Sequence, residues 1–459
     1  MKKILFLLLA FYSISLIAQK TIRGKVVTTK GLPLVGASVY INSTSIGTTT
    51  NDEGEFELVI KNGKYDLIAS YIGFNTAQYS LDTETINQPI VFKLNPKSNM
   101  LDEVVVSNKK NKMSAEDRAY FLAQFKNTFL GKTNLSKQCR ILNEGVIDLD
   151  YDIATRILEA SVSEPIIIEH KGLGYKIYYD LVHFELEPKK VTYLGYTRYE
   201  KLKGSKRKKR RWSKKRKIAY NGSMMHFLKS VIQGNLKEQG FIVDQFKRVP
   251  NPDRPHDSII RKARRLLRNL PKKANKEQNF TLFSTKDLNV ESNRNEVIDR
   301  MKKNPNVKLS EVALERLKKT PMTVTLNDDG TFHAETKIDS NTSRDSLSNI
   351  VSKWRLKRFI DVNIKEDLAM NDFTTKTGKN ISLSFRNYLK VTYTKEPEED
   401  AYRPGPAKLD YQVSTMVLYV SSSLIDPSGI LINPLDVFLE GYWSYEKTGD
   451  ALPLDYTPD

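Results

Sequence analysis

Cysteine is almost absent from this chain of 459 residues, because Cys139 is the only one. An intramolecular disulfide is therefore excluded, and burial of apolar side chains has to stabilise the fold. Long apolar runs are scarce as well. After residue 18 no run reaches the roughly 20 residues of a membrane-spanning helix, so we predict no such helix in the mature chain.

The residues of common metal and catalytic sites are also sparse. Five histidines are present, and none lies in H-E-x-x-H or begins an H-x-x-E pair. His183 and Glu185 share one strand face without a third ligand nearby, so we expect a solvated face there. The chain has no G-x-S-x-G elbow, Walker loop or G-x-G-x-x-G run. We therefore predict a non-enzymatic protein with no catalytic residue, metal or cofactor.

Two further groups admit a catalytic interpretation. Cys139 lacks a local nucleophile signature, and we expect it to be a buried small apolar side chain. Asp148, Asp150 and Asp152 alternate along a predicted strand and would suit sugar hydrolysis, but we expect them to form the solvent face of that strand. A hydrolase with a site built from scattered residues stays open as a third hypothesis.

Acidic residues are outnumbered by basic ones. Lys and Arg total 73 against 54 Asp and Glu, which gives a formal net charge of +19. Such an excess favours anionic partners, namely lipid headgroups, acidic polysaccharide or nucleic acid.

The first eighteen residues read as a secretory signal peptide. Lys2 and Lys3 precede an almost wholly apolar stretch over residues 4–17, and Ala18 offers a small residue for cleavage. An uncut membrane anchor is the alternative, although the apolar run is short for a span. We therefore expect an exported protein of the periplasm or outer membrane, which argues against nucleic acid as the partner.

Residues 19–96 predict a β-sandwich of six or seven short strands. A-S-V-Y-I-N at 37–42 and E-F-E-L-V-I at 55–60 alternate apolar and polar residues as strands do, and Asn62-Gly63 is typical of a tight hairpin turn. The pieces G-K-V-V at 24–27, G-L-P-L-V-G-A-S-V-Y-I at 31–41, G-T-T-T-N-D-E-G-E-F at 47–56 and Y-I-G-F at 71–74 resemble the carboxypeptidase regulatory-like domain. That resemblance implies a transthyretin-like, non-catalytic sandwich.

Residues 97–113 are predicted to be a linker. Within it, Val104, Val105 and Val106 resemble the TonB-box stretch that follows the same sandwich in outer-membrane receptors driven by TonB, where a partner adds a β-strand. The alternative is that these residues form the last strand of the sandwich itself.

Residues 114–459 predict a larger, basic, β-rich α+β domain with a few peripheral helices. We expect helices over 114–129 and 223–239, strands over most of 139–199 and 322–420, and a partly mobile insertion at about 250–320. F-L-G-K-T-N at 129–134 and G-Y-W-S-Y-E near the C-terminus resemble a group of exported envelope proteins, which implies architecture but no activity. The fold class is mainly β.

The least ordinary segment is 201–217, in which twelve of seventeen residues are basic and none is acidic. It is interpreted either as a solvated hairpin loop or as an electrostatic contact with anionic lipid or glycan, in which Trp212 sits at a membrane interface or stacks on a sugar. Basic residues over 259–276 would add a second patch. The candidate anion-binding residues are Lys206, Arg207, Lys208, Lys209, Arg210, Arg211, Trp212, Lys214, Lys215, Arg216 and Lys217.

The sequence thus predicts a binding or scaffold protein of the cell envelope whose basic surface contacts anionic lipid headgroups or glycan. A TonB-linked component of outer-membrane transport is the second hypothesis.

Overall fold

The fold is known from a computed structural model of the chain. It describes residues 19–86, 89–97, 113–270, 323–326, 332–335, 342–378, 380–403 and 408–458. The predicted signal peptide and Val104–Val106 lie outside these residues. Within them, no helix is both long and apolar enough to cross a membrane.

The chain divides into two compact units. The first holds the described residues up to Ile242, together with Ala369–Phe385 and those from Val391 onward. The second holds those of Val243–Leu368 and of Arg386–Lys390. Antiparallel sheets dominate, and the prediction of a mainly β fold is confirmed.

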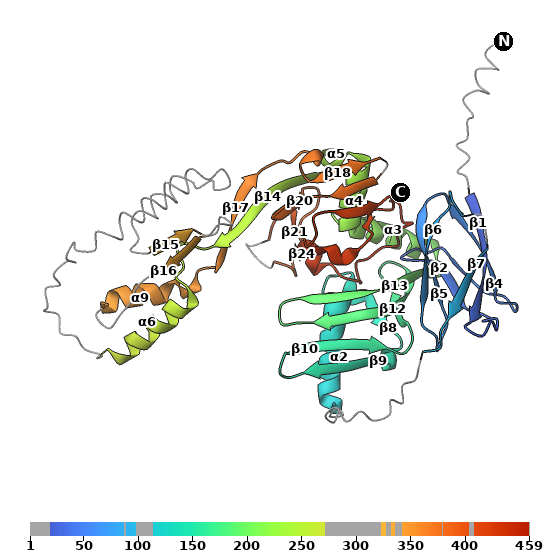
Figure 1. Cartoon of the computed structure of the whole chain (residues 1–459), viewed down its shortest axis with the longest axis horizontal. Helices are drawn as coiled ribbons and strands as arrows, with labels where there is room; N and C mark the ends of the chain where they lie inside the picture. Colours follow the sequence, from blue (N-terminus) through green and yellow to red (C-terminus); the bar gives the residue numbers. More distant parts are fainter. Residues whose placement is uncertain are drawn as a thin grey trace, which may run out of the picture. The chain divides into compact units, whose positions relative to one another are not determined.

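The N-terminal part of the first unit is a seven-stranded sandwich, drawn in blue in Figure 1. One sheet has the order β4-β1-β7 and the other β3-β2-β5-β6. Their facing sides enclose a core that includes Val26, Phe56 and Leu67. The strands are β1 (Gln19–Thr28), β2 (Ser38–Ile41), β3 (Gly47–Thr49), β4 (Glu55–Lys61), β5 (Lys64–Ser70), β6 (Ala77–Asp82) and β7 (Ile90–Leu94).

A six-stranded sheet follows, with helix α2 (Ala115–Phe129) packed on it (Figure 1). Ser114 caps this helix by accepting from the Asp117 N–H at 3.0 Å, as a serine before two acids predicts. Phe125 and Phe129 are buried against the sheet, whereas Phe121, which shares their four-residue spacing, is half-buried. The strands are β8 (Cys139–Ile141), β9 (Ile147–Asp152), β10 (Ile157–Val162), β11 (Ile166–His170), β12 (Tyr175–Leu186) and β13 (Val191–Lys201).

The remainder of the first unit includes helix α4 (Met224–Gln233), whose Phe227 is buried against Phe373 and Trp443. The single helix predicted over 223–239 is wrong in one respect, because Gly234 turns with φ of 71° and ends α4 before the short α5 (Leu236–Gln239). The other elements are α3 (Lys206–Tyr220), β18 (Thr374–Thr377), β19 (Asn380–Leu383), β21 (Gln412–Leu418), β22 (Ser423–Asp426), β23 (Ile430–Leu431), β24 (Val437–Gly441) and α10 (Tyr442–Tyr445).

The second unit pairs β17 (Phe359–Lys365) with most of β14 (Phe241–Pro250), and α6 (Asp257–Asn269) packs on α9 (Arg344–Ser352) through Ala263 and Leu347. The sequence predicts strands over most of 322–420, and a strand beginning at Trp354 would be part of that prediction. Its start is wrong, because Lys353–Arg355 forms the 3₁₀ turn η3 and β17 begins only at Phe359. Strands β15 (Thr323–Leu326) and β16 (Phe332–Glu335) pair antiparallel, within the region predicted to be rich in strands. Strand β20 (Tyr388–Tyr393) has residues in both units.

In the first unit, residues 42–45 form a loop of the sandwich that covers part of the free edge of β13. Thr44 and Arg198 form a parallel β-bridge. The Ser43 N–H donates to Thr197 O at 2.7 Å, and the Tyr199 N–H donates to Thr44 O at 3.0 Å. An uncovered edge would leave these groups to water or to another chain, so the sandwich protects the larger sheet.

The C-terminal segment fastens the same loop. Asp455 accepts from the Ser45 N–H at 2.9 Å and from the Ser45 hydroxyl at 2.5 Å, and the Leu454 N–H donates to Ser43 O at 2.8 Å. Sandwich, β13 and C-terminal segment therefore meet at a single loop.

Removing the Asp455 carboxylate should loosen this junction. Since Asp455→Ala loses both bonds to Ser45, we expect about 1 kcal/mol less stability to urea and faster hydrogen exchange at the Ser45 amide. Asp148→Ala, on the exposed face of β9, is the control. Unchanged exchange at Ser45 would show that the carboxylate does not hold the loop.

The turn after α10 contains Asp450 and contacts His170. These two buried groups make contributions to stability that depend on pH in opposite directions. Burial raises the pKa of Asp450 to about 7, although the Thr133 hydroxyl donates to it at 2.7 Å. Burial lowers the pKa of His170 to about 4, and its Nε2 lies 2.8 Å from Gly449 O while its Nδ1 accepts from the Leu173 N–H at 3.2 Å. His170 is thus held neutral, with its proton on Nε2.

These two groups make opposing contributions to stability between about pH 4 and 6.5. The raised Asp450 pKa gives stability at low pH that is lost as the pH rises towards 7. The lowered His170 pKa gives stability above 6.5 that is lost as the pH falls towards 4.

Asp450→Asn should therefore remove the Asp450 contribution, while those of His170 and of the neighbouring buried Glu446, whose pKa burial also raises, remain. Relative to the parent, its free energy of unfolding should rise with pH by up to about 1.4 kcal/mol per unit across this window. Urea unfolding at several pH values measures it, with Asp150→Asn, on the exposed face of β9, as the control. A parallel profile for Asp450→Asn and the parent would contradict the assignment.

Candidate anion-binding surface

The basic segment 201–217 is mostly helix, so the interpretation as a hairpin loop is wrong. Helix α3 spans Lys206–Tyr220, and the Lys208 N–H donates to the Ser205 cap at 3.4 Å. Lys and Arg have high helix propensity, and the side chains of Trp212, Ala219 and Tyr220 supply a buried face. Spacings of seven and eight residues place these three on one side of the helix.

Trp212 anchors α3 and does not face solvent. Its side chain is 9% exposed, and its Nε1–H donates to Lys171 O at 2.9 Å. The indole lies between Gly174 and Gly204, where an added Cβ would come within 2.2 Å and 2.5 Å of ring atoms. The predicted contact of Trp212 with a membrane or a sugar is therefore wrong, because its ring is used in packing.

Two of the eleven candidate residues also serve mainly to dock the helix. The Arg216 guanidinium donates through Nε to Leu173 O at 2.8 Å and lies 4.0 Å from the Tyr175 ring centroid. Lys215 donates to the Gln138 side chain at 2.5 Å. With Trp212, these side chains bind the turn before β12 and the residue before β8.

The other candidate side chains face solvent. With about 3.6 residues per turn, most of them lie on the side of α3 opposite Trp212. Among the residues that the structure describes, none of them forms an ion pair. We call them the α3 cationic face: Lys206, Arg207, Lys208, Lys209, Arg210, Arg211, Lys214 and Lys217.

This arrangement is electrostatically unfavourable for an isolated helix. Lys206, Arg207 and Lys208 lie in the first turn, where the backbone dipole is positive and no acid is present. Lys206 with Arg210, and Arg210 with Lys214, are like-charged pairs at four-residue spacing, each unfavourable by about 0.2–0.5 kcal/mol. An anion bound at this end would relieve both effects.

A cationic pocket lies near the helix in the same unit. It has a volume of about 540 Å³, and its lining includes Lys126, Lys132, Lys137 and Arg140. Lys126 is paired with Glu144 at 2.9 Å. Lys137 of the pocket lining precedes Gln138, the acceptor of the Lys215 bond, so the pocket adjoins the residue to which α3 is docked.

The predicted second basic patch begins on α6 in the other unit. Its exposed cations are Arg261, Lys262, Arg264, Arg265 and Arg268. Ile260 and Ala263 are buried on the opposite side, so α6 is amphipathic. The part of the patch after Leu270 lies outside the described residues.

The catalytic candidates of the sequence, Cys139 and the three aspartates of β9, lie apart from the α3 cationic face in the chain. Burial raises the pKa of the Cys139 thiol to about 12, which disfavours the thiolate. Asp148, Asp150 and Asp152 are exposed along β9, as expected for a solvent face. Within the described ranges, no three His, Cys, Asp or Glu side chains are placed to hold a metal ion.

Comparison with known proteins assigns the N-terminal region. The model of the CarboxypepD_reg-like domain matches residues 22–106, a range that includes Val104–Val106. The TonB-dependent receptor SusC of Bacteroides thetaiotaomicron is 35% identical over 121 residues, which are 25% of this chain and 12% of the receptor. The TonB-dependent receptor P39 of Formosa agariphila is 31% identical over 104 residues, which are 22% of this chain and 10% of that receptor.

The chain thus spans about a tenth of the length of these relatives, and the matched region carries the similarity. The sandwich of β1–β7 falls almost wholly within it. Residues 22–106 are therefore a CarboxypepD_reg-like domain, homologous over that region to TonB-dependent receptors.

Proposed function

We propose that this chain is an exported, non-enzymatic protein of the cell envelope that binds anionic lipid headgroups or glycan through the α3 cationic face. The similarity to TonB-dependent receptors supports an envelope role. One docked helix presents eight cations to solvent, and this is the main observation in support of the proposal.

The docking of α3 makes this a surface of defined shape. Trp212 and Arg216 fasten the helix to backbone carbonyls of residues 171–174, so its cations keep their relative positions when they meet a ligand. A preformed array loses less conformational entropy on binding than a flexible loop would. Phosphate and carboxylate groups match it, because Lys and Arg donate charge-assisted hydrogen bonds to both.

Neutralising three cations of this face should weaken binding without harming the fold. The change Lys206→Gln, Arg207→Gln and Arg210→Gln removes about 1 kcal/mol of attraction per residue, so affinity for phosphatidylglycerol vesicles should fall by about two orders of magnitude at low salt. Sedimentation over a salt series measures this, and an acidic polysaccharide replaces the vesicles in a second arm.

The matched control changes Lys30, Lys61 and Lys93 of the sandwich to Gln, which removes the same charge from exposed positions. Thermal melting should show that the α3 variant is at least as stable as the parent, because repulsion within the helix decreases. Equal binding by the α3 variant and the parent in both arms would reject the proposal.

A TonB-linked component of transport is the second candidate function. It is supported by the similarity to TonB-dependent receptors and by the reach of the domain match to residue 106. Addition of Val104–Val106 as a strand to a partner sheet would supply the contact.

Pull-down with a TonB C-terminal domain tests this candidate directly. Deletion of Val104–Val106 should abolish capture of the full chain, whereas deletion of residues 107–109 should preserve it. Capture that survives the first deletion, or that is missing for the parent, would exclude this mode of binding.

A further inference from the structure

The second unit carries a short segment in which cations alternate with large apolar side chains. Residues 353–359 read K-W-R-L-K-R-F and contain no acid. Trp354 is 49% exposed, Leu356 41% and Phe359 53%. Other large apolar side chains of the chain are as exposed, but here three of them lie within six residues, and such a local concentration suits a contact with another phase or partner.

The fold holds this segment in place from both ends. Turn η3 continues α9, whose Leu347 is buried against Ala263 of α6. At the other end, the Asn251 side chain donates to Lys357 O at 3.0 Å, and its backbone N–H donates to Arg358 O at 2.9 Å. The exposed side chains are therefore presented by a fixed backbone.

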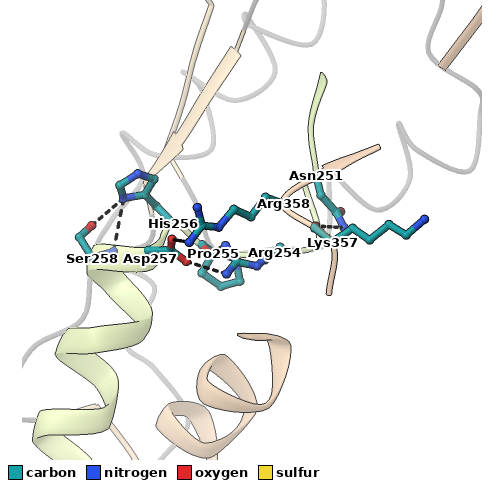
Figure 2. A network of polar contacts seen from close by, with 8 residues as sticks. All are labelled: Asn251, Arg254, Pro255, His256, Asp257, Ser258, Lys357 and Arg358. Atoms are coloured by element: carbon teal, nitrogen blue, oxygen red, sulfur yellow. Dashed lines mark hydrogen bonds and ion pairs between the residues drawn. The ribbon is translucent and has the colours of Figure 1, made fainter. Parts of the chain in front are cut away.

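Figure 2 shows the polar network that ties the segment to the start of α6. Arg358 and Arg254 converge on Asp257, with nitrogen–oxygen distances of 2.5 Å and 2.6 Å. The hydrogen bond from Arg254 lowers the pKa of Asp257 and so keeps it charged. The Lys357 side chain points away from the network (Figure 2), so its ammonium group is directed to solvent.

The cations of α6 adjoin the exposed indole. The Arg264 guanidinium lies 5.2 Å from the Trp354 ring centroid, and that of Arg355 lies 5.9 Å from it. In such cation–π contacts, the guanidinium keeps its N–H donors free for a phosphate. Apolar groups flanked by Arg and Lys, with a tryptophan among them, match the layered chemistry of a bilayer interface.

We propose that residues 353–359, with the exposed face of α6, form a second and separate contact that anchors this unit to a bilayer containing anionic phospholipid. Trp354, Leu356 and Phe359 enter the boundary between headgroups and acyl chains, and the surrounding cations bind lipid phosphates. A glycan would leave Leu356 and Phe359 without apolar partners, and for that reason the bilayer is the better match. The inference needs a membrane within reach, as the proposed envelope role provides, but it does not need the α3 cationic face.

The tryptophans of the chain allow a direct test. Of the three, Trp212 and Trp443 are 9% and 5% exposed, so only Trp354 is open to lipid. Mixed phosphatidylethanolamine and phosphatidylglycerol vesicles with brominated acyl chains should quench and blue-shift part of the emission. Trp354→Phe should remove that quenched part, while binding largely persists.

Affinity is measured with the same lipids without bromine. The triple change Trp354→Ala, Leu356→Ala and Phe359→Ala should weaken binding by about tenfold or more, because membrane affinity scales with the apolar area buried. The matched control replaces the exposed Leu32, Ile72 and Ile153 by Ala and should bind like the parent.

The outcomes separate the two proposals. If the α3 variant still shows quenching of Trp354, the anchor acts independently of the α3 cationic face. The inference is overturned if vesicle-bound parent shows no bromine quenching that depends on Trp354, or if the triple variant binds like the parent. Sedimentation with phosphatidylcholine alone should fall well below that with the anionic mixture, and equal binding to both would also overturn it.

Discussion

Helix α3 remains folded and docked because a few directional hydrogen bonds to backbone carbonyls offset the repulsion between its like-charged side chains. The Trp212 N–H and the Arg216 guanidinium donate to carbonyls within residues 171–174, and the indole fills a space that Gly174 and Gly204 leave open. Without this anchor, a cationic first turn and repelling neighbours would favour an unfolded segment. These contacts therefore hold the α3 cationic face in a fixed position, with its side chains directed to solvent.

Some side chains of α3 dock the helix and others face solvent. For this reason the sequence predicted the position of the cationic surface better than it predicted which residues belong to it. Charge density alone identified the segment, and eight of the eleven predicted residues do face solvent. It could not distinguish Lys215 and Arg216, because their roles depend on Gln138 and on carbonyls that lie far away in the chain. The spacing of Trp212, Ala219 and Tyr220 was a signal for an amphipathic helix, but the surrounding charges obscured it.

The same limit applies to the fold. Alternation and turn residues sufficed for β4, β5 and the Asn62-Gly63 hairpin, because those signals are local. The predicted number of six or seven strands includes the short β3 and β6, but their positions were not predicted, since their pairing with β2 and β5 is decided by the opposite strands. Trp354 and Arg355 of the 3₁₀ turn η3 were likewise interpreted as strand, because apolar–polar alternation fits both an exposed turn and a sheet edge.

The loop at residues 42–45 has a consequence for how the two parts of the first unit depend on each other. Since Ser43 and Thr44 pair with Thr197 and Tyr199, the larger sheet is complete only when the sandwich is folded beside it. A shortened polypeptide without the sandwich would present a bare strand edge that a second molecule can join. The N-terminal module therefore occupies the β13 edge at Thr197–Tyr199, and while it does so that stretch of strand is closed to pairing with a second molecule.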